Sequence, residues 1–526
     1  MKLGIDFGTC FSFIATCKPN GKPYPLAGGD DNERIYDIGG GIPTVFFHDA
    51  NHYEIMGKIA ADRRIKHPEY GVVNIKKVLR DKSSFDLVFP LGIEGNNQYE
   101  YPAKYIVVKF IKFLIDNAIE RFRIDFPSED SNLENVVIAV PAASTHWYKK
   151  FTRECAAEAT EEYQLTMDKI KLIPEPVAAA LSYFENNPGI ADGTRILVYD
   201  LGGGTFDTAI VEYDSSQWRR FNIIAHSGDT QIGGTDWDKE LFKHVITESG
   251  HSNSIFTETQ KCEIEQKVIE AKIRLSTEDS TDFSYYHKEP KIMVFADELT
   301  QEKFKELTKD KLDRTLSRVN LLIDEYREKY GSDAKIDTIV LTGGASRMPM
   351  VREALDEFKA MYPGLNIHSE RPDRAIAFGA AIYAAADFPP LMVVPHTYGV
   401  VTTMKQSRND KGVKRIRNIL FKGTKIESEH SDREYISSKV EGFTPTESTQ
   451  KTLTVRVYES DESHSKCINV GKPKFHITFP FETLSNITTT ERKFDVEIGL
   501  DSNGILEVHV FDKNLNKEIG CEVGDL

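Results

Sequence analysis

Two patterns of apolar and polar positions divide the chain. Up to about residue 386, short apolar runs such as Val136–Val140 alternate with stretches of helical periodicity such as Glu175–Glu185, which is typical of α/β architecture. From about residue 396 to residue 526, apolar and polar residues alternate over short stretches, as in Leu453–Val457 and Phe494–Ile498. This second pattern predicts an all-β region of antiparallel strands, and the Asn-Gly pair at 503 and 504 predicts a tight hairpin turn.

Residues 387–395 separate the two patterns. Pro389 and Pro390 exclude helix there, and the apolar run Leu391–Val394 follows them. We expect an interdomain linker, and the alternative is an edge strand, because proline is tolerated where such strands begin. The predicted organisation is an α/β domain over residues 1–386, a linker over 387–395 and an all-β domain over 396–526.

An internal repeat lies within the α/β part. Leu3–Thr9 returns as Leu197–Gly203, and Glu175–Ala180 has a looser echo in Asp373–Phe378. Two copies of one lobe are the simplest explanation. We therefore expect two related lobes that face each other across a cleft.

Composition narrows the classes of partner. The chain has 526 residues and a net charge of −15, which disfavours nucleic acid or an anionic membrane surface as the main partner. No apolar run approaches the roughly 18 residues that span a membrane, and Met1–Asp6 leads directly into a predicted core strand rather than a cleavable signal. The six cysteines are scattered, with no close pair typical of zinc or redox sites. We expect a cytoplasmic protein of several domains.

Both copies of the repeat carry a candidate phosphate loop. In each, an apolar strand delivers an aspartate, Asp6 or Asp200, and glycine and a hydroxyl residue follow before the next strand. Glycine lets backbone N–H groups approach phosphate oxygens, and the aspartate can orient a hydrated divalent cation. One Asp-x-Gly hairpin is foremost a turn signal. Two in register, the second with three consecutive glycines at 202–204, favour a nucleotide site with Asp6 and Asp200 on opposite sides.

Other nucleotide-binding signatures do not occur in the sequence. There is no Gly-x-x-x-x-Gly-Lys-Ser/Thr loop and no helix-opening Gly-x-Gly-x-x-Gly, so the commoner nucleotide folds are not indicated. A third glycine cluster, Val340–Arg347, follows an apolar strand and ends in a cation. It could lie against a nucleoside, and the alternative is a plain strand-to-helix turn.

Together these motifs resemble the actin-like ATPases and, within them, the seventy-kilodalton heat-shock (Hsp70) chaperones, across essentially the whole chain. They occur in the family's order and at roughly its spacing. They are Ile5–Thr9, Val140–Ala142, Glu175–Ala180, Asp200–Asp207, Ile232–Gly234, Gly343–Arg347, Asp373–Ala381 and Asp501–Val508. The last of them looks like the family's late substrate-domain hairpin. The resemblance implies an α/β actin-like ATPase domain of two duplicated lobes, followed by an all-β sandwich that binds peptide.

The resemblance also implies roles for particular positions. Asp6 and Asp200 would hold Mg²⁺ through water. Lys76, Glu175, Asp200, Thr205 and Asp207 would form the catalytic set, with Lys76 beside the γ-phosphate and with Glu175 and Asp207 orienting the attacking water. The implied contacts to ATP or ADP are Asp6, Gly8, Thr9, Cys10, Gly202, Gly203, Gly204, Thr205, Gly233, Gly234, Lys272, Ser276, Gly343, Gly344, Ala345, Arg347 and Asp373.

For two of these residues, a purely structural role is the alternative to a catalytic one. On its own, Lys76 would be assigned to the surface, as most lysines are. Glu175 precedes a predicted helix and could simply cap it.

Several positions depart from the family pattern. Cys10 stands in place of a second threonine, so the first loop carries a weakly bonding thiol instead of a hydroxyl. Ile273 stands in place of an arginine that stacks on adenine, which predicts weaker ATP binding. Pro389 and Pro390 alter the linker, where the family receives its J-domain co-chaperone. Only fourteen residues follow Asp512, too few for the family's helical lid, so we expect a lidless member, with a truncated chain as the alternative.

The predicted function is that of an ATP-dependent chaperone that binds extended apolar segments of unfolded polypeptides and slowly hydrolyses Mg-ATP to ADP and phosphate. The implied partners are unfolded clients, a J-domain co-chaperone and a nucleotide exchange factor, with no nucleic acid and no membrane. Two alternatives stay open. A non-hydrolysing ATP-binding adaptor or co-chaperone would keep the fold and use nucleotide to set its shape. A small-molecule kinase of the same superfold would leave the C-terminal β domain without an evident purpose.

Overall fold

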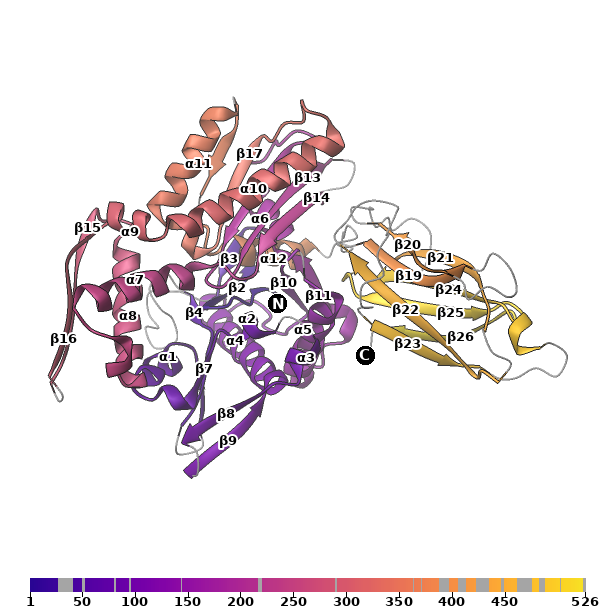
Figure 1. Ribbon diagram of the computed structural model, residues 1–526, viewed down its shortest axis with the longest axis horizontal. Coiled ribbons are helices and arrows are strands. Elements are labelled where there is room, and N and C mark those ends of the chain that lie inside the picture. Colours follow the sequence, from indigo (N-terminus) through magenta and orange to yellow (C-terminus); the bar gives the residue numbers. More distant parts are fainter. Residues whose placement is uncertain are drawn as a thin grey trace. The chain divides into compact units, whose positions relative to one another are not determined.

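The computed structural model describes most of the chain (Figure 1). Its described residues are 1–26, 41–49, 53–79, 82–93, 96–142, 144–215, 220–288, 291–362, 364–369, 371–386, 397–404, 413–421, 435–445, 449–460, 475–481, 488–501 and 503–523. The predicted linker, 387–395, lies outside them. Contacts within the chain divide it into two compact units, residues 1–142 with 151–388 and residues 143–150 with 389–526.

Two mixed sheets form the framework of the first unit. The strands of the first sheet run in the order β11 (Ile170–Pro174), β10 (Asn135–Val140), β1 (Lys2–Asp6), β2 (Phe11–Cys17) and β3 (Pro23–Pro25), and β4 (Ile42–Pro43) also pairs with β2. Those of the second run in the order β18 (Asn366–His368), β17 (Thr338–Thr342), β12 (Arg195–Leu201), β13 (Phe206–Asp214) and β14 (Arg220–Asp229). We call residues 1–174, around the first sheet, lobe I, and residues 195–368, around the second, lobe II.

The two sheets have the same plan. β1 pairs antiparallel with β2 and parallel with β10, just as β12 pairs antiparallel with β13 and parallel with β17. The outer pairs match as well, because β2–β3 and β13–β14 are antiparallel while β10–β11 and β17–β18 are parallel. The sequence repeat therefore corresponds to two sheets of one topology. Each carries an aspartate, Asp6 or Asp200, at or next to the end of its central strand.

Two alanine-rich helices, α6 (Glu175–Asn186) and α12 (Ala375–Ala386), pack against each other, and α12 also contacts β1 and β2 of lobe I. Their backbones approach closely. A Cβ added at Gly379 of α12 would lie 2.7 Å from the Cα of Ala178 in α6, and one added at Gly4 of β1 would lie 2.7 Å from the Cα of Ala381. Such overlap explains why glycine and alanine fill this crossing.

The remaining elements of the first unit surround the sheets. Those between β4 and β11 are β5 (Val45–His48), β6 (Glu54–Met56), α1 (Gly57–Lys66), β7 (Gly71–Val73), α2 (Ile75–Val78), α3 (Lys82–Phe85), β8 (Val88–Ile93), β9 (Asn96–Pro102), α4 (Ala103–Asp125) and α5 (His146–Ala159). The first residues of α5, 146–150, are grouped with the second unit. Those of lobe II are α7 (Gly234–Glu248), α8 (Glu258–Arg274), β15 (Ser280–His287), β16 (Ile292–Thr300), α9 (Gln301–Leu307), α10 (Lys309–Tyr330) and α11 (Pro349–Met361).

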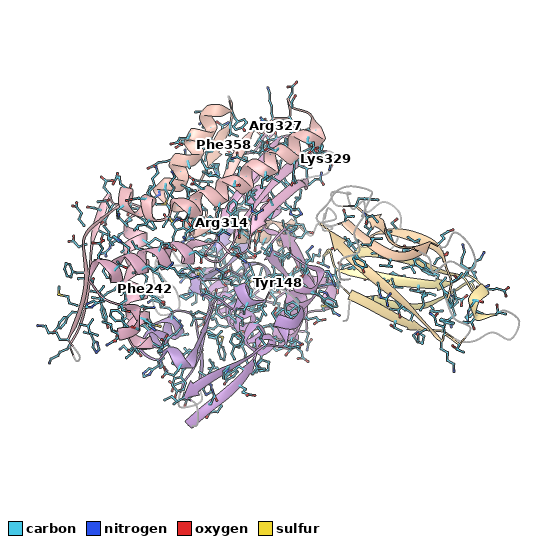
Figure 2. The ribbon with its side chains drawn as sticks, viewed as in Figure 1. Tyr148, Phe242, Arg314, Arg327, Lys329 and Phe358 are labelled. Carbon is cyan, nitrogen blue, oxygen red and sulfur yellow. The ribbon has the colours of Figure 1, made fainter. Side chains whose placement is uncertain are left out.

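Helix α10 illustrates how an amphipathic sequence covers the sheet of lobe II. Its buried residues recur every three or four positions, from Leu312 and Val319 to Tyr326, as a helix with one apolar face requires. They join one core with Trp237 of α7. The exposed Arg314 and the basic residues near the C-terminal end of the helix are labelled in Figure 2. No helix among the described residues is both long enough and apolar enough to cross a bilayer.

The second unit contains two four-stranded antiparallel sheets. One has the order β20 (Val413–Leu420), β19 (Thr397–Met404), β22 (Thr452–Ser460) and β23 (Phe475–Pro480). The other has the order β21 (Tyr435–Phe443), β24 (Phe494–Asp501), β25 (Leu506–Asp512) and β26 (Lys517–Val523). Inward-facing side chains from both, such as Val455 and Val496, share one core, so the two sheets form a sandwich.

The predicted Asn-Gly turn joins β24 to β25. Gly504 has a φ of +70°, and its N–H donates to the carbonyl oxygen of Asp501 at 2.8 Å. A positive φ is the reason for glycine at this position. The antiparallel strands predicted on either side of this turn are confirmed.

Candidate functional site

The two Asp-Gly loops contact each other where the lobes meet. A Cβ added at Gly203 would lie 3.0 Å from the Cβ of Cys10 and would overlap the Cys10 thiol. A Cβ added at Gly204 would lie 2.7 Å from the methyl group of Thr9. The first loop therefore packs directly on the glycines of the second, and larger residues would push the loops apart.

Helix α7 supports the second loop from within lobe II. The N–H groups of Gly234 and Thr235 donate to the carbonyl oxygens of Gly202 and Gly203, at 2.9 and 2.8 Å. A Cβ added at Gly233 would lie 2.6 Å from the Cα of Gly204. The predicted contact residues Gly233 and Gly234 are thus placed against the phosphate loop.

The third glycine cluster lies beside Asp200. Gly343 follows β17 with a φ of +79°, and a Cβ added there would lie 2.7 Å from Oδ1 of Asp200. Its N–H donates to the carbonyl oxygen of Pro372 at 2.9 Å, and a short 3₁₀ turn, Gly344–Arg347, follows. The cluster is therefore a strand-to-helix turn in its local geometry, and it also forms part of the surroundings of Asp200.

Lys76 and Glu175 form a buried ion pair next to these loops. Lys76 Nζ lies 2.8 Å from Glu175 Oε1, and the two side chains are only 12% and 6% exposed. Glu175 is the first residue of α6, whose N-cap is Pro174 and has no side-chain capping bond. The surface assignment for Lys76 is therefore wrong, and Glu175 is the first residue of α6 rather than its N-cap.

Three aspartates lie near this ion pair, and the pKa of each one is raised. Burial raises the pKa of Asp6 to about 7, with Lys76 lowering it and Glu175 raising it. Burial and Glu175 raise the pKa of Asp207 to about 7, against the effect of Lys76 and of a hydrogen bond from Thr205. Burial, Glu175, Asp207 and Asp6 together raise the pKa of Asp200 well above its ordinary value. The structure thus brings the predicted catalytic residues and the predicted magnesium aspartates into one cluster.

The chemistry of this cluster fits a divalent cation with its water shell. Four acidic side chains surround one lysine, and an additional positive charge would offset their mutual repulsion. Among the described residues, no group of three or more His, Cys, Asp or Glu side chains is arranged to bind a metal directly. Contact of Asp6 and Asp200 with Mg²⁺ through water, a mode that this ion favours because it dehydrates reluctantly, stays a prediction.

Two other predicted ATP contacts, Lys272 and Ser276, form polar contacts within lobe II. Lys272 Nζ lies 2.7 Å from Asp238 Oδ1 and donates to the Gly234 carbonyl at 3.2 Å. The Ser276 hydroxyl donates to the carbonyl of Lys272 at 3.2 Å.

The remaining predicted contacts also have nearby partners. Arg347 forms an ion pair with Asp373. The N–H of Gly8 donates to the Ser12 hydroxyl at 3.2 Å. Ala345 packs near Gly234, and a Cβ added at Gly344 would meet no atom within 4 Å.

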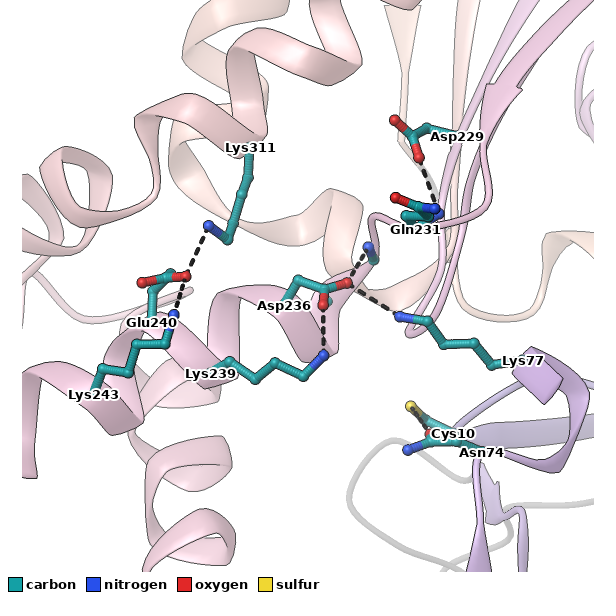
Figure 3. Close-up of polar contacts among 12 residues, drawn as sticks. Cys10, Asn74, Lys77, Asp229, Gln231, Asp236, Lys239, Glu240, Lys243 and Lys311 are labelled. Atoms are coloured by element: carbon teal, nitrogen blue, oxygen red, sulfur yellow. Dashed lines mark hydrogen bonds and ion pairs between the residues drawn. The ribbon is translucent and has the colours of Figure 1, made fainter. Parts of the chain in front are cut away.

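Sequence reasoning missed several residues that join these parts, and Figure 3 shows three of them. The Cys10 thiol donates to Asn74 Oδ1 at 3.7 Å, and Lys77 of α2 pairs with Asp236 of α7 at 3.3 Å. Asp236 lies in the first turn of α7 and accepts from the Gly233 N–H at 3.0 Å, and the general preference for acidic residues at helix N-termini is the signal that could have identified it. Nothing local to Lys77 identifies its partner, since the two residues lie 159 positions apart.

A comparison of the sequence with protein-family models identifies the family. The model described as Hsp70 protein matches residues 128–524, which is well over half of the chain. The match includes Glu175, Asp200 and Asp207 together with the strands of the second unit, while Asp6 and Lys76 precede it. The resemblance read from the motifs is thereby confirmed, and the chain belongs to the Hsp70 protein family.

Proposed function

We propose that the chain is an ATP-dependent chaperone in which an actin-like domain hydrolyses Mg-ATP and a β-sandwich binds extended apolar segments of unfolded polypeptides. The actin-like domain would occupy residues 1–386, the linker 387–395 and the sandwich 396–526. Family membership supports a chaperone that binds ATP. The observation that carries the finer proposal is the Lys76–Glu175 pair amid Asp6, Asp200 and Asp207, next to two glycine loops in contact.

Each residue of the cluster has a distinct task in this proposal. The N–H groups of the glycine loops hold the phosphates, and Lys76 neutralises charge that develops on the transferred phosphoryl group. Glu175 and Asp207 orient the attacking water. Asp207, with a pKa near 7, is suited to accept its proton at neutral pH. Mg²⁺, held through water by Asp6 and Asp200, supplies charge neutralisation at the phosphates when it is bound.

The proposed partners follow from the same assignment. We propose unfolded polypeptide clients, a J-domain co-chaperone and a nucleotide exchange factor, and a cytoplasmic location. The altered linker residues Pro389 and Pro390 suggest that the co-chaperone contact differs from the family pattern.

Single-turnover hydrolysis tests the enzymatic part. Trace radiolabelled ATP is mixed with excess protein and Mg²⁺, and the conversion to ADP is followed. We expect Lys76→Ala to slow conversion by about a hundredfold or more, the usual effect of removing one positioned charge. Lys58→Ala, a lysine of α1 that pairs with the exposed Asp62, serves as the control and should hydrolyse at the wild-type rate. If wild-type protein converts ATP no faster than Lys76→Ala, the ATPase proposal fails.

A second candidate function is a non-hydrolysing ATP-binding adaptor. It is favoured by Cys10, which places a thiol against Gly203, and by Ile273, which is 42% exposed at the end of α8. The same experiment separates the two functions. Tight binding of ATP without conversion in wild-type protein would select the adaptor.

A further inference from the structure

The hydroxyl group of Thr342 is buried at the end of β17, next to the strand that carries Asp200. Thr342 is the last residue of β17 and is 0% exposed. Among the described residues, no group forms a hydrogen bond with its Oγ1. Burial removes the bonds that a hydroxyl makes to water, which is unfavourable where nothing replaces them. Valine has nearly the same shape and avoids this cost, so a hydroxyl here indicates a partner outside the chain's own sheet.

Other buried threonines of this sheet do have partners within it. Thr338, at the other end of β17, donates to the carbonyl oxygen of Asn366 at 3.3 Å. Thr208 of β13 donates to the carbonyl oxygen of Val198 at 2.9 Å. Each of these hydroxyls therefore contributes to the internal bonding of the sheet. Thr342 differs from them, and its position explains the difference.

The neighbour of Thr342 across the sheet is Asp200. Strands β12 and β17 are parallel, and Asp200 and Thr342 are register partners in them. Neighbouring strands lie about 4.8 Å apart, and paired residues of parallel strands project from the same face. The next residue, Gly343, leaves space beside the carboxylate, because a Cβ added there would lie 2.7 Å from Asp200 Oδ1. The hydroxyl of Thr342 is thus placed beside the carboxylate of Asp200.

The electrostatics of Asp200 agree with this placement. Burial and the neighbouring carboxylates raise the pKa of Asp200, and the hydroxyl of Thr342 lowers it. A hydroxyl that donates toward a carboxylate favours its ionised form and offsets part of the repulsion from other carboxylates. Because the hydroxyl carries no charge, it can orient the carboxylate without competing with a cation for it.

We propose that Thr342 is a positioning residue whose hydroxyl donates to the Asp200 carboxylate when nucleotide and Mg²⁺ are bound, and holds that carboxylate toward the hydrated cation. The inference rests on the proposed function, because it requires that Asp200 contacts Mg²⁺ through water. The bond gives the buried hydroxyl a partner and fixes one orientation of the carboxylate, as outer-shell groups of metal sites do. Thr342 acts through Asp200, so its effect is on the binding of Mg²⁺ with nucleotide.

The Mg²⁺ dependence of nucleotide binding tests this role without requiring hydrolysis. The affinity of the full chain for the fluorescent analogue N-methylanthraniloyl-ADP is measured in EDTA and then at rising concentrations of free Mg²⁺. Thr342→Val keeps the shape of the side chain and removes the hydroxyl. We expect it to raise the Mg²⁺ concentration for half-maximal tightening by about tenfold or more, with the affinity in EDTA unchanged. Thr342→Ser keeps the hydroxyl and should require nearly the wild-type concentration.

Thr338→Val is the matched control. It makes the same substitution in the same strand, but it removes a hydroxyl that already has a partner within the sheet. We expect it to lower the melting temperature and to leave the Mg²⁺ dependence as in wild type. Thr342→Val, by contrast, should unfold in EDTA at or above the wild-type temperature, because the hydroxyl that it removes has no partner there.

The outcomes separate this role from the proposed function. Equal Mg²⁺ dependence in wild type and Thr342→Val would overturn the positioning role alone, as would an equal shift in Thr338→Val. A melting temperature of Thr342→Val below that of wild type in EDTA would contradict the unpaired hydroxyl from which the role is inferred. A wild-type chain that does not bind the analogue, or whose affinity does not respond to Mg²⁺, would overturn the proposed function, and the role of Thr342 with it.

Discussion

At the scale of single residues, the candidate site depends on close approach of the glycine backbone of the second loop to side chains of the first loop. Gly203 faces Cys10 and Gly204 faces Thr9, with no room for a Cβ at either glycine. Such positions are needed only if the two loops must meet. The glycines therefore contribute to the site because they lack a side chain that would separate the two loops.

This closeness predicts the effect of Gly203→Ala. The added methyl group would overlap the thiol of Cys10, and overpacking of this kind costs about 1–3 kcal/mol. Since the strain falls on the two loops, we expect the affinity for ADP to fall by about fivefold to 150-fold, measured by isothermal titration calorimetry. Lys58→Ala, in α1 and outside both loops, is the control. Equal loss of affinity in both variants would contradict a specific contact at Gly203.

The identities of the main site residues could be predicted from sequence, but their connections could not. Asp6 and Asp200 follow from the repeat, and Lys76, Glu175 and Asp207 follow from motif order within the family resemblance. The Lys77–Asp236 pair could not be predicted, because it depends on how two distant elements pack. The same holds for the left-handed Asn74, since its conformation serves a contact with Cys10 that no local pattern records.

At the scale of elements, the periodicity of apolar residues was a sufficient guide where one face is buried. The helix predicted at Glu175–Glu185 is α6, and the alternating stretches at Leu453 and Phe494 are β22 and β24. What periodicity could not indicate is which strands become neighbours. The parallel pairing of β12 with β17 joins segments that lie far apart in sequence, and no local pattern predicts it.

A buried histidine of β25, His509, contacts one glutamate of β25 and one of β26. His509 Nδ1 lies 2.7 Å from Glu518 Oε1, and its Nε2 lies 3.3 Å from Glu507 Oε2. Glu497 of β24 is its register partner on the other side. The His509 side chain is only 4% exposed. The hydrogen bond with Glu507 makes the largest contribution and raises the pKa of His509. Burial lowers this pKa, and the hydrogen bond with Glu518 raises it, so the net shift is upward.

The raised pKa of His509 predicts that the second unit loses stability as the pH rises. The contribution of the protonated ring is fully present below the ordinary histidine pKa of about 6.5 and is lost as the pH passes through the raised value in the folded protein. Histidine-selective NMR titration of the full chain can measure that value, with His509→Gln identifying the resonance. Glu518→Gln should lower the pKa of His509. A pKa at or below 6.5 in the wild-type chain would contradict the effect of the two glutamates.

At the scale of the whole molecule, the change of pattern near residue 390 corresponds to a change of architecture. The first unit combines mixed sheets with helices, and the second contains two antiparallel sheets around their own core. In the proposed chaperone, nucleotide binding in one unit and peptide binding in the other influence each other. Such coupling is reciprocal by thermodynamic necessity.

Reciprocity leads to a prediction for the intact protein. If ATP changes the affinity for an extended apolar peptide, the peptide must change the affinity for ATP by the same factor, typically between about fivefold and 150-fold. Fluorescence anisotropy of a labelled peptide measures the first effect without nucleotide and in saturating ATP, and a third titration in saturating ADP compares the two nucleotide states. Calorimetry of ATP binding with and without peptide measures the second. Lys76→Ala is used for both, because slow hydrolysis keeps ATP intact during the titrations. Equal peptide affinities in the two nucleotide states would refute a coupled chaperone even if the wild-type chain hydrolyses ATP.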